Sequence, residues 1–471
     1  MACGHNRRVN RRLVFDGDSP PSYPSRVPAD NPTTKGAGMM KTHLLSVIAL
    51  IAVLSPPAAA QTPAPRAAGA PKELRVGIVT LLSGPASSTF GIPAKKAADA
   101  WVEKINDEGG IGGVKIVPVL TDEAGPGDKV VAEFRRLAAD ERVDLVIGYI
   151  SSANCVAVPA VAEELKVLTV LFDCGTTRVF EEAKYKYVFR TAAHTGIDGI
   201  GAARYLLAAK PDVKTIAGLN QDYAWGRDSW EIFSRALRKL KPDVQVVETL
   251  WPKLFQGDLS AEISKLLTAK PDVIFHSLWG TDLASVNSQG RVRGLFRQSL
   301  VIHNNSAFLF KEFRDLPDGF VVGFRGTHWP EVPDPARNPL QKEFIERCTK
   351  KFGEPCGSPH GSYHMVQALQ GVKTAYEKAI KATGRWPSVD DVVKAFEYLE
   401  FDSPSGRIAM AVGGGHQAIE DSLYGTVKLD PQRSQNVLTS VRVFPAKCVN
   451  PPDGVKTLDW IDQGFRGAQC P

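Results

Sequence analysis

The sequence predicts an α/β protein built from two doubly wound, parallel-sheet lobes, with the chain crossing between the lobes more than once. Short apolar runs rich in β-branched residues alternate with segments of helical periodicity from Leu74 onward. This order is typical of parallel sheets covered by helices on both faces. A second set of such units follows after residue 193. The length of 471 residues and a hydrophobic content of 43% are sufficient for two cores.

In the first set, strands and helices alternate regularly. The first strand is predicted at "LRVGIVTLLS", and the helix after it places Ala94, Ala98, Trp101 and Ile105 at helical spacing before a Gly-Gly pair ends it. The following elements are predicted at "VKIVPVLT" (strand), "DKVVAEFRRLAADE" (helix), "VDLVIG" (strand), residues 156–165 (helix) and "VLTVLF" (strand).

In the second set, Lys-Pro-Asp-Val occurs three times, beginning at Lys210, Lys241 and Lys270. Proline ends the preceding helix, and the Pro-Asp pair favours a turn into the next strand. We interpret the copies as loops between helices and strands, because the segments between them differ. Strands are predicted at "VKTIAGLN", "VQVVETL", "VIFHSLW", "SLVIHNN", "GFVVGFRG" and "LTSVRVFP", and long helices at residues 341–352, 363–382 and 389–399.

The N-terminal region carries the pattern of a secretory signal peptide. "MMK" precedes an apolar segment at residues 44–54, and "AAAQ" follows it. The apolar segment is too short to span a bilayer, which takes about 20 residues. We therefore expect a signal peptide at residues 39–60, cleaved near Ala60, a linker at 61–73 and a periplasmic mature protein. Residues 1–38 are interpreted as a mis-annotated leader, with a genuine disordered leader as the alternative.

The cysteines predict disulfide bonds, because an exported protein folds in an oxidising compartment. Six cysteines remain after Cys3 of the leader, and six allow several connectivities. Proximity along the chain favours the pairs Cys348–Cys356 and Cys448–Cys470, which would leave Cys155–Cys174. No Cys-x-x-Cys or Cys/His spacing suggests zinc, so no metal site is expected.

Charge and motifs argue against nucleic acid and against catalysis. The formal charge is +6, but no block of Lys or Arg lies inside the predicted fold. The sequence contains no G-x-S-x-G, P-loop or H-E-x-x-H motif. Gly199 and Gly201 resemble part of a dinucleotide fingerprint, but Arg204 stands where that motif needs its third glycine. We expect no catalytic residue, no cofactor and no nucleic-acid partner.

Polar and aromatic residues gather at the carboxyl ends of the predicted strands. Ligands bind at these ends in open α/β sheets, and exposed N–H groups there favour an anion such as a carboxylate. Helix capping is the alternative for any single residue. The set comprises Ser83, Tyr149, Ser151, Ser152, Asp173, Thr176, Asn220, Asp222, Trp279, Asn304 and Asn305.

Several of these segments resemble the periplasmic binding proteins of ABC importers, of the branched-chain amino-acid (leucine/isoleucine/valine) type. The resemblance covers about Leu74 to Phe444 and rests on "LSGP", "INDEGGIGGVKI", "VIGYISSANC", "FDCGTT" and "LNQDYAWGRD" in this order. It implies a type I periplasmic binding fold with a three-crossover hinge. We place one lobe at 74–193 plus 325–411 and the other at 194–324 plus 412–471.

The resemblance also implies which residues hold a ligand. The serine that holds the ligand carboxylate falls on Ser152, and the threonine paired with it falls on Thr176. The carbonyl that receives the ligand ammonium falls near Cys174. The family's ammonium-binding glutamate falls on Asn305, a departure that puts α-amino-acid specificity in doubt. The aromatic positions fall on Phe90, Trp225 and Trp279.

These residues predict a ligand cradle at "GYISSANC", with Ser151 and Ser152 on its polar side, Tyr149 among its aromatic walls, and Cys155 pinning it to Cys174. The leading hypothesis is a monomeric solute-binding protein that delivers a small solute to an ABC permease in the inner membrane. The expected solute is a carboxylate or amide, amino-acid-like or an aromatic acid, rather than a simple branched-chain amino acid. An exported ligand-sensing module or an enzyme on the same fold is the alternative.

Overall fold

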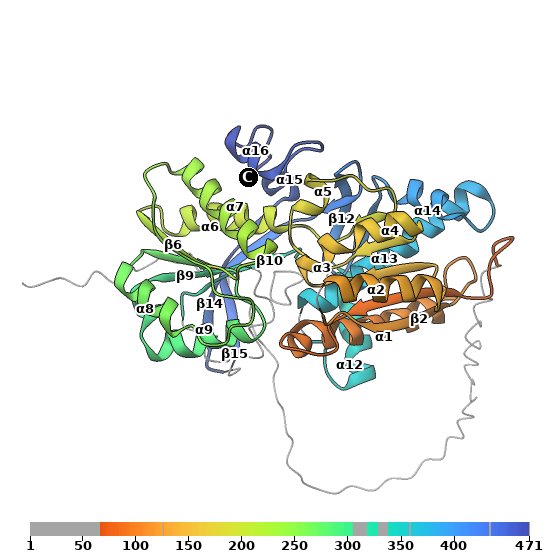
Figure 1. The fold of residues 1–471 in the computed structure, drawn as a ribbon, viewed down its shortest axis with the longest axis horizontal. Helices are drawn as coiled ribbons and strands as arrows, with labels where there is room; N and C mark the ends of the chain where they lie inside the picture. Colours follow the sequence, from red (N-terminus) through yellow and green to blue (C-terminus); the bar gives the residue numbers. More distant parts are fainter. Residues whose placement is uncertain are drawn as a thin grey trace, which may run out of the picture. The chain divides into compact units, whose positions relative to one another are not determined.

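The strands form two sheets, each flanked by helices, so the predicted α/β fold is confirmed (Figure 1). We call the parts of the chain built around the two sheets the first and the second lobe. The computed structural model describes residues 66–125, 127–304, 318–327, 338–357, 359–432 and 435–470. The predicted signal peptide and Asn305 lie outside the described residues.

The sheet of the first lobe contains eight strands of the described chain. Five of them pair in parallel, as predicted, and an antiparallel group of three joins this part through β13. The order across the sheet is β11 (Glu400–Ser403), β12 (Gly406–Val412), β13 (Gln417–Ile419), β5 (Val188–Arg190), β4 (Leu168–Leu171), β3 (Leu145–Gly148), β1 (Leu74–Thr80) and β2 (Ile116–Asp122).

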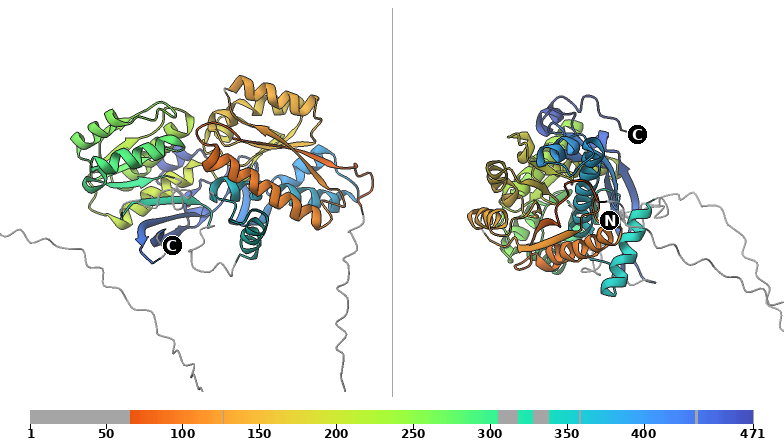
Figure 2. Two further views of the ribbon diagram at one scale, coloured as in Figure 1. Left: turned by 90° about the horizontal axis from the view of Figure 1, so that it is seen from below. Right: turned by 90° about the vertical axis from the view of Figure 1, so that its right-hand side faces the viewer.

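Helices cover both faces of this sheet. α1 and α13 pack together on one face, and α2 and α4 lie on the other (Figure 1). α12 lies beside α1 (Figure 2). The two helices are joined by an edge-to-face contact of Trp101 and Phe344, with ring centroids 6.0 Å apart. The helices of this lobe are a π-helical turn η1 (Ser87–Gly91), α1 (Ile92–Asp107), α2 (Gly127–Ala139), α3 (Ser152–Ala157), α4 (Pro159–Leu165), α5 (Arg178–Glu181), α12 (Pro339–Phe352), α13 (Pro359–Thr383) and α14 (Val389–Phe396).

The sheet of the second lobe contains seven strands of the described chain. Its central strands run parallel, while β10 pairs antiparallel with β14 and β14 antiparallel with β15. The order is β15 (Gln435–Phe444), β14 (Ser422–Asp430), β10 (Val321–Arg325), β9 (Leu300–His303), β8 (Val273–His276), β6 (Thr215–Leu219) and β7 (Gln245–Leu250).

The predicted Lys-Pro-Asp-Val loops lie between helices and strands of the second lobe. Lys210, Lys241 and Lys270 are the C-caps of α6, α7 and α8, and a strand follows each loop. α6 and α7 cover one face of the sheet, and α8 and α9 the other (Figure 1). These helices are α6 (Thr195–Ala209), α7 (Ala224–Leu240), α8 (Ser260–Ala269), α9 (Thr281–Val292) and α10 (Leu295–Gln298).

The chain passes between the two sheets three times: after β5, after β10 and after β13. The lobe boundaries drawn from the sequence stay a prediction, but one of them needs correction. β13 pairs with Arg190 of β5 and therefore belongs to the first sheet, although it lies beyond residue 411. The short strands β11 and β12 form a hairpin that carries the chain on to this pairing.

The C-terminal segment, residues 445–470, packs on the second lobe and also contacts the first. α15 packs against α6, and α16 against α7. Asp453 accepts hydrogen bonds from the Tyr398 hydroxyl and the Gly414 N–H, each at 3.0 Å, and both donors belong to the first lobe. The helices of the segment are α15 (Ala446–Val449) and α16 (Thr457–Asp462).

The three cysteine pairs predicted from the sequence are disulfide-bonded. Cys155–Cys174 joins α3 to the residues after β4, with Cα atoms 6.5 Å apart, inside the usual range of about 4.4–6.8 Å. The other two bonds are Cys348–Cys356 and Cys448–Cys470.

Among the described residues, no helix is both long enough and apolar enough to cross a membrane.

Candidate functional site

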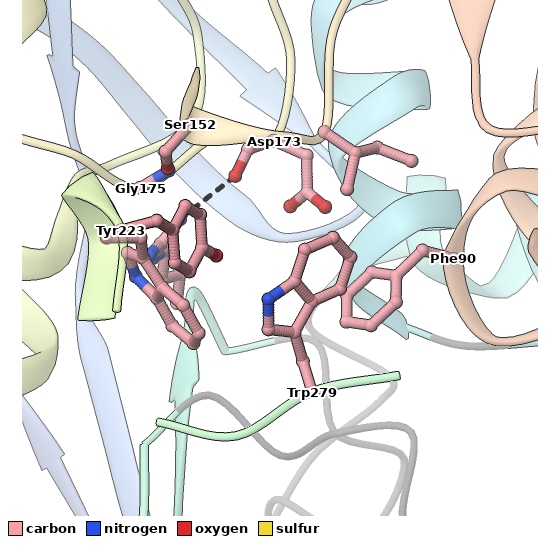
Figure 3. Close-up of a pocket in the computed structure, with 9 residues that line it drawn as sticks. Phe90, Ser152, Asp173, Gly175, Tyr223 and Trp279 are labelled. Carbon is pink, nitrogen blue, oxygen red and sulfur yellow. Dashed lines mark hydrogen bonds between the residues drawn. The ribbon is translucent and has the colours of Figure 1, made fainter. Parts of the chain in front are cut away.

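A small cavity lies where strand ends of the two lobes meet (Figure 3). It measures about 30 Å³ for water-sized molecules, within about 340 Å³ of space that atoms do not fill. Both lobes contribute to its wall, as predicted for a ligand cleft. The lining residues are Phe90, Ile150, Ser152, Asp173, Gly175, Tyr223, Trp225, Trp279 and Arg325.

Ser152, the first residue of α3, gives the cavity a hydroxyl group. Its Oγ accepts hydrogen bonds from the backbone N–H groups of Gly175, at 3.1 Å, and Thr176, at 3.2 Å. A hydroxyl has one hydrogen to donate in addition to the bonds it accepts. Ser152 can therefore donate to an oxygen atom in the cavity while the two N–H groups hold its side chain in place.

Glu123 fixes the loop before α3 through hydrogen bonds to its backbone. Its buried carboxylate accepts hydrogen bonds from the N–H of Ile150 at 2.8 Å, the N–H of Ser151 at 2.7 Å and the Asn154 side chain at 3.1 Å. Burial raises the pKa of Glu123 to about 7, although these donors act to lower it. Ser151, a predicted ligand residue, thus bonds to Glu123 through its backbone and does not line the cavity.

We expect the stability of the protein to fall between pH 5 and pH 8 because of Glu123. The folded pKa of about 7 lies above the ordinary value of 4.5, so the folded state binds the proton more tightly. The free energy of unfolding therefore falls by about 3 kcal/mol at most, because the two pKa values differ by roughly two and a half units and one unit corresponds to about 1.4 kcal/mol. Glu123→Gln, which carries no charge at any pH, lacks this dependence. Urea unfolding of the wild type and of Glu123→Gln at pH 5 and pH 8 tests this. If the difference in unfolding free energy between the two proteins were the same at both pH values, the prediction would be wrong.

A buried ion pair forms the second-lobe side of the cavity. Arg325 ends β10, and its Nη2 lies 2.6 Å from Oδ2 of Asp198 on α6, with side-chain exposures of 1% and 2%. Its Nη1 donates to the backbone carbonyl of Asp173 at 3.1 Å, across the lobes (Figure 3). Burial acts to lower the pKa of Arg325, but the carboxylates of Asp198, Asp173 and Glu420 together raise it, with Asp198 contributing most.

Asp173 adds a carboxylate to the wall. It follows β4, is 5% exposed, and accepts a hydrogen bond at 2.5 Å between its Oδ1 and Nδ1 of His364 on α13. Figure 3 shows its carboxylate beside the ring of Trp279. The cavity therefore contains an acceptor as well as donors.

Aromatic rings make up most of the apolar wall. Phe90 and Trp279 meet edge to face with centroids 5.5 Å apart, and Tyr223 and Trp279 lie 6.5 Å apart. The indole N–H of Trp225 is buried and has no hydrogen-bond partner among the described residues, while the indole N–H of Trp279 interacts with the Tyr223 hydroxyl. Two indole donors thus lie in side chains that line the cavity.

Two predicted ligand side chains point elsewhere, which corrects the prediction. Tyr149 is 1% exposed and packs in the core of the first lobe, with no hydrogen-bond partner for its hydroxyl among the described residues. Thr176 donates its hydroxyl to Oδ2 of Asp228 on α7 at 2.5 Å and is not part of the cavity wall. Its side chain connects the lobes and leaves no hydroxyl hydrogen for a ligand.

The carbonyl predicted to receive a ligand ammonium is also occupied. The backbone oxygen of Cys174 accepts a hydrogen bond from Nη1 of Arg190 at 3.1 Å. Arg190 is fully buried. The positive charge of Arg190 therefore opposes a ligand ammonium at the oxygen to which the resemblance assigns it, and Asn305 lies outside the described residues.

Tyr223, Gly175 and Arg325 also line the cavity, but none of them was predicted from the sequence to contact a ligand. Each had a signal. Tyr223 lies in the quoted motif "LNQDYAWGRD", and Gly175 lies in "FDCGTT". Arg325 is a charged residue at the end of the apolar run "GFVVGFRG", where a buried partner is required.

The sequence profile of the family described as periplasmic binding protein matches residues 73–433. The chain belongs to this family. The predicted family is thus confirmed, and the family's members bind substrates rather than transform them. The cavity between the lobes corresponds to the place expected for their ligand.

Similar proteins agree with this membership. The Leu/Ile/Val-binding protein homolog 3 of Brucella melitensis is 26% identical, covering 72% of this chain and 86% of that protein. A solute-binding protein of an ABC transporter from Rhodopseudomonas palustris BisB5, solved with 3,4-dihydroxybenzoic acid, has a TM-score of 0.68 at 20% identity, covering 80% of this chain and 98% of the other. An ABC-type branched-chain amino acid transporter protein from Rhodopseudomonas palustris CGA009 has a TM-score of 0.63 at 24% identity, covering 82% of this chain and 100% of the other.

Proposed function

We propose that this periplasmic binding protein is the solute-binding component of an ABC importer, and that its solute is a small carboxylate with a flat or apolar body. One observation carries the proposal. The cavity wall combines the Ser152 hydroxyl and the indole N–H groups of Trp225 and Trp279 with aromatic faces. Donors of this kind suit carboxylate oxygens, and aromatic faces suit planar groups.

A simple α-amino acid fits these contacts less well. The backbone oxygens of Asp173 and Cys174 already accept from arginines, whose positive charge opposes an ammonium group at the same oxygen. Asp222 pairs with Arg227 at the surface and is not in the wall. The Asp173 carboxylate is the one anionic group among the lining residues, and it already accepts from a histidine. An aromatic acid or hydroxy acid needs no ammonium site.

Similar proteins support both the aromatic acid and the amino acid as candidates. Three similar solute-binding proteins have been solved in complex with 3,4-dihydroxybenzoic acid, 4-hydroxybenzoate and benzoate. The curated relatives are named as Leu/Ile/Val-binding protein homologues. We favour the aromatic acids, because the wall of this cavity supplies the donors and rings described above.

The location follows from the family, which works in the periplasm. We further propose that residues 39–60 are the signal peptide that directs export, with cleavage near Ala60. The mature protein would then act as a monomer and dock to a permease of the inner membrane. Loss of solute uptake on deletion of the gene would distinguish an importer from an exported sensor.

Calorimetric titration tests the solute class. We expect binding of benzoate or 4-hydroxybenzoate and weaker or no binding of leucine and benzamide. Ser152→Ala is expected to weaken carboxylate binding roughly 10- to 150-fold, because a hydrogen bond to a charged group contributes about 1.5–3 kcal/mol. Ser83→Ala is a matched control, since Ser83 bonds to Asp122 outside the cavity. Micromolar leucine binding with the acids silent would overturn the proposal.

A further inference from the structure

Two histidines and an aspartate meet beside the cavity, between α13 and the end of β4. His360 and His364 lie four residues apart on α13, so their side chains share one face of the helix. Asp173 reaches this face from the residues after β4 and also lines the cavity (Figure 3). One potential ligand atom from each of the three residues lies within 4.8 Å of the others. The exposures are 0%, 0% and 5%.

We propose that Asp173, His360 and His364 bind a divalent metal ion of the zinc type next to the solute cavity. Two imidazoles and one carboxylate form a donor set that zinc and its first-row neighbours prefer. Ligand atoms of a zinc ion lie about 2.0–2.2 Å from it, so atoms that are up to 4.8 Å apart must move toward one another to bind it. Three protein ligands leave a coordination position for water or for an oxygen of the solute.

A further buried carboxylate interacts with the cluster. Glu420, which follows β13, is 1% exposed, and its Oε1 accepts from the N–H of Ala193 at 2.8 Å, while Oε2 has no partner among the described residues. Arg325 pairs with Asp198 and also interacts with Asp173 and Glu420. A divalent ion at the cluster would add positive charge beside these last two carboxylates.

The hydrogen bond between His364 and Asp173 is compatible with this inference. Its atoms, Nδ1 and Oδ1, lie 2.5 Å apart, with the proton on the histidine nitrogen when Asp173 is ionised. A metal ion that binds this nitrogen displaces the proton to solvent and takes its place between the two groups. The competing role is purely structural, with His364 positioning Asp173 and no ion bound.

No metal site was expected from the sequence, because Cys-x-x-Cys and Cys/His spacings are absent from it. The signal was His-x-x-x-His in "HGSYH", the spacing that places two imidazoles on one face of a helix. A second pair of buried histidines provides a contrast. His276 and His303 stack in the second lobe with centroids 4.5 Å apart, but among the described residues they belong to no metal-binding group.

Titration of Zn²⁺ and Co²⁺ into chelator-treated mature protein, without solute, tests the inference independently of the proposed function. We expect one ion per chain and visible Co²⁺ absorption typical of nitrogen and oxygen ligands. His360→Gln and His364→Gln are each expected to weaken binding at least roughly 10- to 100-fold, the range for disturbing groups that only support a metal ligand. His276→Gln is the matched control and is expected to keep the wild-type affinity.

If a histidine variant does not fold, Asp173→Asn gives a second measurement, because asparagine keeps the size but loses the charged ligand. Circular dichroism reports the fold of each variant. Absence of stoichiometric metal in the wild-type titration would overturn the inference. An equal loss of affinity in His276→Gln would overturn it too, because binding would then not reside in this cluster.

Discussion

Replacing Arg325 by methionine is expected to lower the free energy of unfolding by about 3–5 kcal/mol and to abolish solute binding. Asp198 would then keep a buried charge without its partner, since both side chains are almost completely shielded from water. The variant also removes the hydrogen bond from Nη1 to the carbonyl of Asp173, which connects the lobes beside the cavity. Chemical denaturation and calorimetry of the variant measure the two effects.

Two further variants separate charge from packing. Arg325→Met combined with Asp198→Asn removes both charges, so we expect partial recovery of stability without recovery of binding. Arg407→Met is the matched control, because Arg407 pairs with Glu400 and Asp402 at the surface, and such pairs contribute about 0–1 kcal/mol. If Arg325→Met bound solute as the wild type does, the buried pair would have no part in the site.

The central strands could be predicted because their signal is local. β1, β3 and β8 are short apolar runs between helices, and such a run needs no distant partner to be recognised. The strands after residue 400 were largely missed. β13 has only three residues and pairs with Arg190, more than 220 residues earlier in the chain. Periodicity within a window carries no information about that pairing.

The site could be predicted in part, and the errors have a physical cause. Phe90, Ser152, Trp225 and Trp279 are predicted residues that line the cavity, although their contact with a solute stays a prediction. Tyr149 was placed in the wall, but successive side chains of an extended chain point to opposite sides. Its neighbour Ile150 lies in the wall instead.

The partners of the buried charged residues could not be predicted from the sequence. Arg325 and Asp198 are 127 residues apart, and His364 is 191 residues from Asp173. A charged residue in an apolar run shows that a partner must exist, but it does not show which one. The same holds for Thr176, whose hydroxyl bonds to Asp228 of the other lobe.

Gly175→Ala is expected to weaken solute binding roughly 10- to 100-fold with a smaller effect on secondary structure, because overpacking a close contact costs about 1–3 kcal/mol. A Cβ atom at this position would lie 2.4 Å from Nη2 of Arg325 and 2.5 Å from Nε1 of Trp225. Neither neighbour can move at low cost. Arg325 is held by Asp198 at 2.6 Å, and the Trp225 ring is a buried part of the cavity wall.

Gly127→Ala is the matched control, since its added Cβ would meet only Ala157, at 3.3 Å, away from the cavity. Calorimetry with the solute found for the wild type, and circular dichroism of both variants, make the comparison. Wild-type affinity in Gly175→Ala would mean that Arg325 and Trp225 can shift to accommodate the methyl group without weakening solute binding. A loss confined to Gly175→Ala would mean that solute binding requires the close approach of the two lobes at this residue. The N–H of Gly175 bonds to Ser152 of the first lobe, and an added methyl group would meet Arg325 and Trp225 of the second.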